Sequence, residues 1–341
     1  MPATRPTARP VAAVARPLAA ALTTVLVGST TVLAGCGTAP DAAPGAAAPA
    51  DAPLTDAPAT GTPSPVTSTT PAGAAPGRPA PAEEFPVAYR TVDLNRDGNR
   101  RLPVRVWYPA AGDAVADGRF PVVLFSHGLG GVPADYRVVL EQWAAAGFVV
   151  AAPTYPYTSQ GGSGGNALDV LNQPADASYV LDELLALDAR PGDSFAGRLD
   201  VDRVAAAGHS AGGITTVGLF TVARDDRLDA GIVLAGSALG VGTAFSGAAA
   251  PQLFIHGELD EVVSYASGKA AYDRVPWPKA MLSLPDGDHG RSLLQPGDPA
   301  FAVVLDTSTD FLRWTLYGDA TARQRLDAVP PAGVAILDNQ L

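Results

Sequence analysis

The sequence predicts an α/β protein with a mostly parallel central sheet that is covered by helices on both faces. From Phe85 onward, short apolar runs typical of buried strands alternate with segments in which apolar residues recur at helical spacing. The chain of 341 residues is also 47% hydrophobic, which is enough for a sizeable buried core. We therefore expect one folded domain over residues 85–341.

The strands are expected where apolar runs are bounded by turn residues. The first two form a pair joined by the turn Asn95-Arg96-Asp97-Gly98, and the later ones are short and apolar throughout, as in a buried parallel sheet. The expected strands are Val87–Asp93, Leu102–Tyr108, Val122–Phe125, Phe148–Ala152, Val204–Ala207, Gly231–Leu234, Gln252–Ile255 and Met281–Leu284.

The helices are expected between these strands. Val180, Leu181 and Leu184 recur at helical spacing, so the segment around them should cover one face of the sheet. The expected helices are Asp135–Ala146, Pro174–Leu187, Ala211–Ala223, Ser264–Arg274 and Phe301–Leu316. The Gly-rich stretch Ser159–Asn166 interrupts the alternation and is a candidate mobile loop.

The first 35 residues are expected to be a lipoprotein signal peptide. Arginines precede an apolar stretch from about Leu18 to Leu33 that is short for a membrane span, and Leu33-Ala34-Gly35-Cys36 resembles the bacterial lipobox. Cys36 is the sole cysteine, so it is the expected lipidation site and no intramolecular disulfide can form. The alternatives are a plain signal peptide or a short span with an incidental cysteine. The lipobox predicts an exported protein anchored by its lipid to the outer face of the cell membrane.

Residues 36–84 are expected to form a disordered tether behind the lipidated cysteine. Ala, Pro, Thr, Gly, Ser and Asp dominate this stretch, and no aromatic residue occurs before Phe85. Such a composition cannot bury enough apolar surface to offset the entropy of ordering the chain.

The charge balance argues against nucleic-acid binding. The chain has 23 basic and 34 acidic residues and a net charge of -11. Phosphate backbones are bound through clustered Lys and Arg, and a surface of this sign repels them.

A nucleophile is expected at Ser210. The motif Gly208-His209-Ser210-Ala211-Gly212-Gly213 lies between an expected strand and an expected helix, which is the context of a nucleophile elbow. Small neighbours let the strand and the helix approach, while the serine occupies the tip of the turn. The alternative is an ordinary Gly-rich helix start.

A serine hydroxyl needs a neighbouring base, and the chain offers four histidines. His209 adjoins Ser210, and the sharp turn should direct its side chain away from the hydroxyl. His127 and His256 follow or end earlier strands. His289 lies on a loop after the last expected strand, which is the position of the base in the chain order nucleophile, acid, base.

Asp260 is the expected acid of the triad because it lies between Ser210 and His289, on the loop after the penultimate expected strand. It would hold the imidazole tautomer and stabilise the imidazolium. The alternatives are Glu258, Asp286 and Asp288, of which the last two stand too close to His289 in sequence to orient it easily. The alternative for Asp260 is a solvated surface charge or a cap for the helix near Ser264.

Two backbone N–H groups are expected to bind the oxyanion of the transition state. One is that of Ala211, directly after the nucleophile. The other is that of Leu129 in the loop His127-Gly128-Leu129-Gly130-Gly131, which otherwise is a flexible turn.

These motifs, together with His256-Gly257-Glu258-Leu259-Asp260 and His289-Gly290, resemble those of the α/β-hydrolase superfamily. The resemblance extends from Phe85 to about Tyr317 and is to dienelactone hydrolases, bacterial cutinases and platelet-activating-factor acetylhydrolases. It implies the α/β-hydrolase fold, hydrolysis of carboxylic esters through an acyl-enzyme, and the same triad and oxyanion donors. Two features depart from these families: no cysteine nucleophile is present, and the disulfides of polyester-degrading cutinases cannot form.

The expected function is that of a serine esterase that acts on small or polymeric esters without a cofactor. Esters with short acyl groups are the preferred expectation. The alternatives are a non-catalytic surface binding protein on the same fold, or a peptidase or acyltransferase with the same triad. The scattered histidines and the absence of a cysteine pair predict no metal site. Oligomeric state is left open. Four aromatic residues are candidates either for the core, which is favoured, or for an acyl pocket: Tyr155, Tyr157, Trp277 and Phe301.

Overall fold

The structure of this protein is a computed structural model that describes residues 79–162 and 165–341. The signal peptide, the lipidation site at Cys36 and the tether up to residue 78 lie outside the described residues. Contacts with the folded domain begin before Phe85, because the carbonyl oxygen of Pro81 accepts a hydrogen bond from Arg313. None of the helices in the described part has the length and hydropathy needed to span a membrane.

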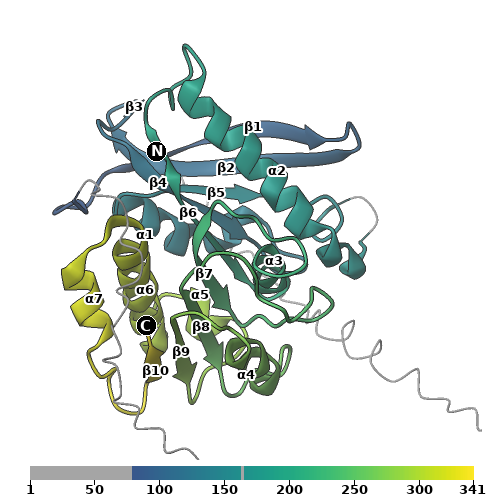
Figure 1. The fold of residues 1–341 in the computed structure, drawn as a ribbon, viewed down its shortest axis with the longest axis vertical. Coiled ribbons are helices and arrows are strands. Elements are labelled where there is room, and N and C mark those ends of the chain that lie inside the picture. Colours follow the sequence, from purple (N-terminus) through teal and green to yellow (C-terminus); the bar gives the residue numbers. More distant parts are fainter. Residues whose placement is uncertain (1–78, 163–164) are drawn as a thin grey trace, which may run out of the picture. The chain divides into compact units, whose positions relative to one another are not determined.

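The centre of the domain is a sheet of ten strands in the order β1-β2-β5-β4-β6-β7-β8-β9-β10, with β3 paired to β2 (Figure 1). The strands from β5 to β9 in this order pair in parallel, whereas β1–β2, β2–β5 and β9–β10 are antiparallel. The predicted mostly parallel sheet is therefore confirmed. The strands are β1 Val87–Arg96, β2 Arg100–Ala111, β3 Ala114–Val115, β4 Phe120–Ser126, β5 Val149–Pro153, β6 Leu199–His209, β7 Leu228–Leu234, β8 Gln252–Gly257, β9 Lys279–Leu284 and β10 Ile336–Gln340.

Helices cover both faces of this sheet. On one face lie α1, α6 and α7, and on the other α2, α3 and α4 (Figure 1). The longer helices are α1 Arg137–Ala145, α2 Gln173–Leu185, α3 Ala211–Leu219, α4 Tyr265–Asp273, α6 Pro299–Leu312 and α7 Ala320–Leu326. The shorter ones are η1 Pro133–Tyr136, η2 Ala167–Leu171, η3 Ala186–Ala189, α5 Arg291–Leu294 and the π-helical turn η4 Arg313–Tyr317.

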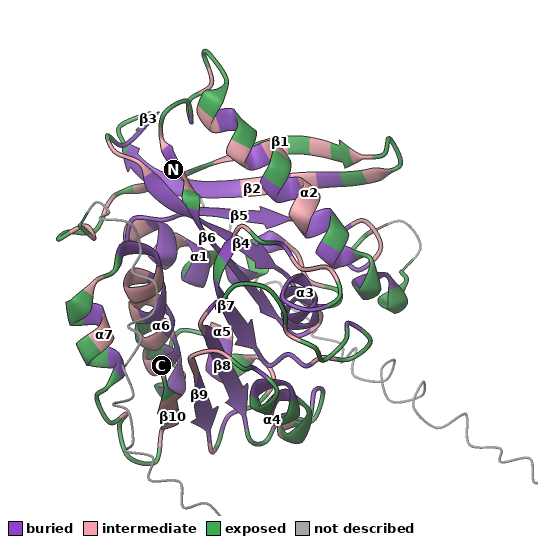
Figure 2. Ribbon diagram, viewed as in Figure 1, coloured by how far each residue is buried: buried purple, intermediate pink, exposed green. Residues whose placement is uncertain are grey.

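Every residue of β4 is buried, which explains its continuous apolar sequence (Figure 2). Successive side chains of a strand point to opposite faces. Val123 and Phe125 accordingly pack in the cluster that includes α1 and α6, and Val122 and Leu124 in the cluster that includes α2. Full burial of one such side chain contributes about 1.5–3 kcal/mol.

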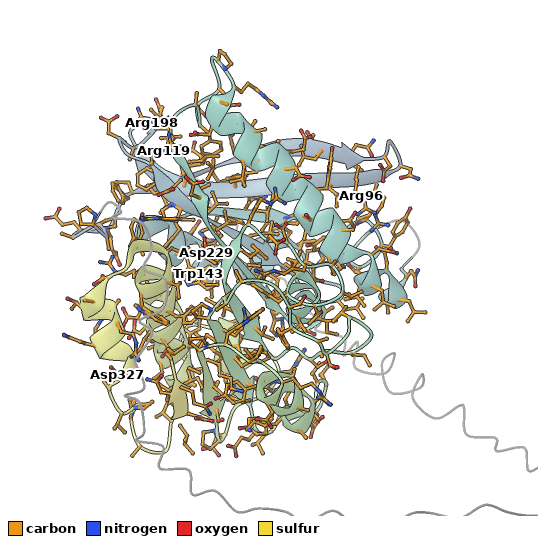
Figure 3. All side chains as sticks on the ribbon, in the orientation of Figure 1. Arg96, Arg119, Trp143, Arg198, Asp229 and Asp327 are labelled. Carbon is orange, nitrogen blue, oxygen red and sulfur yellow. The ribbon has the colours of Figure 1, made fainter. Side chains whose placement is uncertain are left out.

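Trp143 shows how the helices on one face are joined. It is labelled in Figure 3 and lies fully buried on α1. Its indole N–H donates to the hydroxyl of Ser308 on α6 at 3.2 Å. The buried polar atom of the tryptophan therefore has a partner, as burial requires.

Several elements differ from the sequence prediction. The predicted strand Val204–Ala207 is the middle of the longer β6, and the predicted helix Ala211–Ala223 ends earlier, at Leu219. The last two elements, α7 and β10, were not predicted. β10 alternates between exposed and half-buried residues at the edge of the sheet, so it carries little of the apolar signal that marks a buried strand.

Candidate active site

Ser210 occupies a sharp turn between β6 and α3. Its backbone has φ 56° and ψ -119°, in a region that non-glycine residues rarely adopt. A Cβ atom at Gly212 would stand 1.9 Å from the carbonyl oxygen of Ser126, and one at Gly208 would stand 2.2 Å from that of Gly212. The two glycines are thus required by the close approach of α3 to the strands, which holds the serine in its strained conformation.

The structure brings the three predicted triad residues together at the carboxyl edge of the sheet, from loops after β6, β8 and β9. The Nε2 atom of His289 lies 2.9 Å from the Ser210 hydroxyl, and its Nδ1 atom lies 2.7 Å from Oδ2 of Asp260. The Asp260 side chain is fully buried, whereas 19% of the His289 side chain is exposed. This arrangement allows the imidazole to take a proton from the serine while the carboxylate fixes its tautomer.

Asp260 is held ionised by its neighbours. Its Oδ1 atom accepts hydrogen bonds from the N–H groups of Val262 and Val263, both at 2.8 Å, and Nε2 of His256 lies 3.2 Å from Oδ2. Burial alone would raise the pKa of Asp260, but the hydrogen bonds from His256 and His289 outweigh it and hold the pKa well below its usual value. The carboxylate therefore stays charged beside the imidazole.

The other acidic residues near the base have different positions. Asp288 accepts hydrogen bonds from the first N–H groups of α5, so it acts as a helix cap. Asp286 and Glu258 are exposed. The helix cap of α4 is Ser264 and not Asp260.

The predicted oxyanion donors lie beside the nucleophile. A Cβ atom at Gly128 would stand 3.2 Å from Cβ of Ser210, so the loop after β4 packs directly against the elbow. Within the described residues the N–H of Leu129 has no acceptor, whereas that of Gly130 is engaged by the carbonyl of Thr158 at 2.6 Å. Ala211 is the first residue of α3, and the first N–H groups of a helix have no acceptor within it. Among the described residues, both N–H groups therefore lack an acceptor.

The remaining histidines also lie at this edge, and sequence reasoning did not find what they contact. His127 is buried; one ring nitrogen lies 2.8 Å from the carbonyl oxygen of Gly128 and the other accepts from the N–H of Tyr155 at 3.1 Å. Burial lowers the pKa of His127, so the ring is neutral. Its two hydrogen bonds join the loop 127–131, called here the oxyanion loop after its predicted role, to the segment that follows β5. His209 contacts Tyr136 and the backbone of His289. A buried polar ring needs hydrogen-bonding partners. The sequence could therefore indicate that such contacts exist, but not which residues make them.

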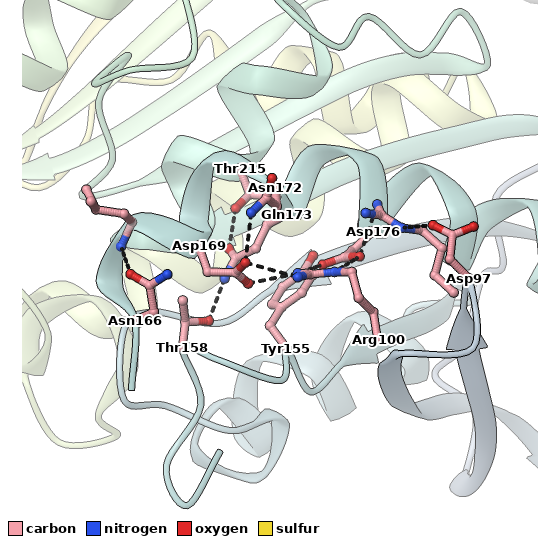
Figure 4. Close-up of polar contacts among 12 residues, drawn as sticks. Asp97, Arg100, Tyr155, Thr158, Asn166, Asp169, Asn172, Gln173, Asp176 and Thr215 are labelled. Carbon is pink, nitrogen blue, oxygen red and sulfur yellow. Dashed lines mark hydrogen bonds and ion pairs between the residues drawn. The ribbon is translucent and has the colours of Figure 1, made fainter. Parts of the chain in front are cut away.

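A second polar network stands behind the oxyanion loop (Figure 4). Gln173, the first residue of α2, is fully buried; its amide donates to the Thr158 hydroxyl at 2.5 Å and accepts from the Thr215 hydroxyl at 2.6 Å. Thr215 lies on α3 and Thr158 also accepts from Gly130. The network therefore links the oxyanion loop to the helix that begins at the nucleophile.

Arg100 closes this region from the side of the β1–β2 hairpin (Figure 4). It donates to Asp169 at 3.0 and 2.8 Å and to Asp176, with Nε at 2.7 Å from Oδ1. Both carboxylates are buried, and only 12% of the Arg100 side chain is exposed. The hydrogen bonds to Asp176 and Asp169 raise the pKa of Arg100 further above its usual value, so the guanidinium is charged, whereas burial raises the pKa of Asp176 against the effect of the arginine.

The four aromatic candidates lie mainly in the core. Tyr155 is fully buried with its hydroxyl 2.8 Å from that of Ser126, and Phe301 is a buried residue of α6. Trp277 packs against two phenylalanines, and Tyr157 lies under the Arg100 guanidinium. In the Gly-rich stretch, residues 163 and 164 are outside the described residues, and the flanking Asn166 is bonded to the carbonyl of Tyr157.

Metal ligands do not gather anywhere in residues 79–162 and 165–341, since no group of three His, Cys, Asp or Glu side chains there has a suitable arrangement.

Comparison with known proteins gives one family match. Residues 87–244, a little under half of the chain, match the family model described as Chlorophyllase. The matched segment contains Leu129 and Ser210 but not Asp260 or His289. No curated protein matches the chain. The specific resemblance to dienelactone hydrolases, cutinases and acetylhydrolases stays a prediction. From the sheet order and this match, the chain has the α/β-hydrolase fold, and the match supports a place in the α/β-hydrolase superfamily.

Proposed function

We propose that the protein is a serine esterase that hydrolyses carboxylic esters through an acyl-enzyme intermediate. The observation that carries the proposal is the hydrogen-bonded line from Ser210 through His289 to Asp260, at 2.9 and 2.7 Å, on a nucleophile turn of positive φ. Structural serines seldom combine a strained backbone with a neighbouring imidazole that is itself oriented by a buried carboxylate.

In the first half of the reaction, the Ser210 hydroxyl attacks the ester carbonyl carbon and passes its proton to Nε2 of His289. The carbonyl oxygen becomes negative and receives hydrogen bonds from the N–H groups of Leu129 and Ala211. Each such donor contributes about 3 kcal/mol to lowering the barrier. His289 then protonates the leaving alcohol, and the acyl group remains on the serine.

In the second half, water enters, gives a proton to His289 and attacks the acyl-enzyme carbonyl. The carboxylic acid leaves and the serine regains its proton. The balance is that of hydrolysis, with water as the only co-reactant, so the proposed reaction uses no cofactor.

The rim of the site supports a substrate with apolar groups. Leu129, Leu239 and Leu259 follow β4, β7 and β8, and their side chains are exposed at the same edge of the sheet as Ser210. Such side chains favour contact with acyl or alkyl parts of an ester. Short acyl esters and apolar polymeric or lipid-like esters are the substrate classes we propose.

The test uses the full chain in detergent with a fluorophosphonate probe and a series of p-nitrophenyl esters from acetate upward. We expect the probe to label Ser210, as shown by mass spectrometry of the peptide, and the esters to be hydrolysed. Matched anilides and an added alcohol acceptor separate an esterase from a peptidase or an acyltransferase, and chlorophyll tests the substrate after which the matching family is named. A folded chain that takes no probe and cleaves no ester would favour the non-catalytic binding protein.

We also propose that the protein is exported and anchored at the outer face of the cell membrane by a lipid on Cys36. The support is the sequence of residues 1–36 alone, which lies outside the described residues. In a bacterial host fed an alkyne-tagged palmitate, the full chain should carry the tag and sediment with membranes, and Cys36→Ala should do neither. Equal labelling of both proteins would disprove the anchor.

A further inference from the structure

A continuous chain of hydrogen bonds joins three loops of the site behind the triad. The N–H of Gly128, in the oxyanion loop, lies 2.8 Å from the hydroxyl of Tyr136. That hydroxyl lies 3.0 Å from Nδ1 of His209, and Nε2 of His209 lies 2.7 Å from the carbonyl oxygen of His289. Because His209 directly precedes Ser210, the chain passes through the nucleophile elbow.

The two ends of the chain fix the direction of every hydrogen bond. The carbonyl oxygen of His289 can only accept, so Nε2 of His209 donates to it. The N–H of Gly128 can only donate, so the Tyr136 oxygen accepts from it. A neutral His209 ring that donates from Nε2 accepts at Nδ1, so the Tyr136 proton points to Nδ1. All members are satisfied when His209 is neutral with its proton on Nε2.

The environment of the chain keeps both side chains in this protonation state. Burial, followed by the nearby His289, lowers the pKa of His209 to about 4, and burial raises the pKa of Tyr136 to about 12. His209 and Tyr136 are both buried, and the rings of His209 and His289 stand 4.9 Å apart between centroids. At neutral pH this series of hydrogen bonds therefore has one arrangement of protons.

We propose that His209 and Tyr136 are positioning residues for the hydrolysis, holding the base loop and the oxyanion loop in register with the nucleophile. The proposal rests on the proposed esterase function. Asp260 orients the His289 ring through Nδ1, and His209 holds the backbone of the same residue at a second point. Tyr136 carries the restraint onward to Gly128, the neighbour of the oxyanion donor Leu129.

The expected effect lies in kcat, because the chain does not touch the substrate. A displacement of catalytic groups by about 1 Å can lower the rate by about 10²-fold. We expect His209→Leu to lower kcat by about that factor, and Tyr136→Phe, which releases Gly128, by about tenfold or more. KM should stay within about twofold in both variants, because the residues that meet the ester are unchanged.

Two conservative variants of His209 distinguish positioning from simple packing. In His209→Gln the side-chain amide can reach the place of Nε2 and donate to the His289 carbonyl. In His209→Asn the shorter amide can meet only Tyr136. If the bond to His289 positions the base loop, Gln should restore most of the kcat that Leu loses, and Asn should not. Tyr89→Phe is the matched control, because Tyr89 lies exposed on β1, far along the chain from these loops.

The experiment measures kcat and KM for p-nitrophenyl acetate, the rate of fluorophosphonate labelling, and the thermal midpoint of each full-length variant. The proposal is supported if folded His209→Leu and Tyr136→Phe lose kcat and labelling rate while His209→Gln recovers them. It is overturned if Tyr136→Phe, His209→Gln and His209→Asn are all folded and all keep the wild-type kcat. It is also overturned if His209→Gln and His209→Asn lose kcat equally. A wild-type chain without labelling or turnover would instead overturn the proposed esterase function itself.

Discussion

Replacing Ser210 with alanine, or His289 with alanine, is expected to lower kcat for ester hydrolysis by about 10⁴-fold or more. Without the hydroxyl no acyl-enzyme forms, and without the imidazole 2.9 Å away the hydroxyl is a poor nucleophile. The measurement is the steady-state rate with p-nitrophenyl acetate, together with fluorophosphonate labelling of each purified full-length variant.

The double variant should be no slower than either single variant, because the serine and the histidine act as one unit. Asp260→Asn should cost about 10⁴-fold, since an amide favours the wrong imidazole tautomer at Nδ1. Asp286→Asn is the matched control: Asp286 is exposed, three residues before His289, and we expect its rate to equal that of the wild type. Independent, additive losses in the double variant, or a normal rate in Asp260→Asn, would contradict the assigned roles.

Removing the Arg100 side chain is expected to lower the free energy of unfolding by about 3–5 kcal/mol, because it leaves the buried Asp169 without a cation and the buried Asp176 with Arg96 alone, at 3.0 Å. Arg100→Met keeps much of the volume of the side chain while Asp169 loses its cation and Asp176 loses one of two. Urea denaturation of the full chain, followed by tryptophan fluorescence, measures the loss.

The control for this prediction is Arg101→Met. Arg101 pairs with Asp93 at 3.5 Å, and both side chains are more than two-thirds exposed, at 77% and 70%. An exposed pair contributes little, so its loss should change stability by less than about 1 kcal/mol. Equal denaturation midpoints for the two variants would contradict the role of the buried cluster.

The pH dependence of Arg100→Met gives a second check. Burial already raises the pKa of Asp176 in the wild type, and Arg100 opposes that rise, so removing the arginine should raise the pKa in the folded variant further above its unfolded value. The folded state then binds more protons, so the stability of the variant should rise as the pH falls. The deficit relative to the wild type should therefore be smaller at about pH 5 than at about pH 7.5.

The parts of the fold that the sequence predicted are those with a local signal. Buried parallel strands such as β4 and β8 are uniformly apolar, and the elbow at Ser210 is marked by glycines whose absence of a side chain the packing requires. Asp260 and His289 were predicted from chain order and from their places after strands. The structure brings His289 within hydrogen-bonding distance of Ser210, and Asp260 within hydrogen-bonding distance of His289. Their chemical roles stay predictions.

What the sequence did not predict depends on contacts between distant segments. Arg100 meets Asp169 and Asp176 from 69 and 76 residues away, and Tyr136 meets His209 from 73 residues away. No periodicity marks such pairs. The sequence placed His209 away from the serine hydroxyl but gave no reason for its ring to lie against the carbonyl of His289.

All four histidines of the chain, His127, His209, His256 and His289, stand at the same edge of the sheet, in or beside the triad. No histidine therefore lies elsewhere in this protein. In an NMR spectrum of protein labelled with ¹⁵N only at histidine, every imidazole signal would come from the proposed active site. The tautomer of each ring, and its response to a bound acyl group, would be directly visible without assigning the rest of the molecule.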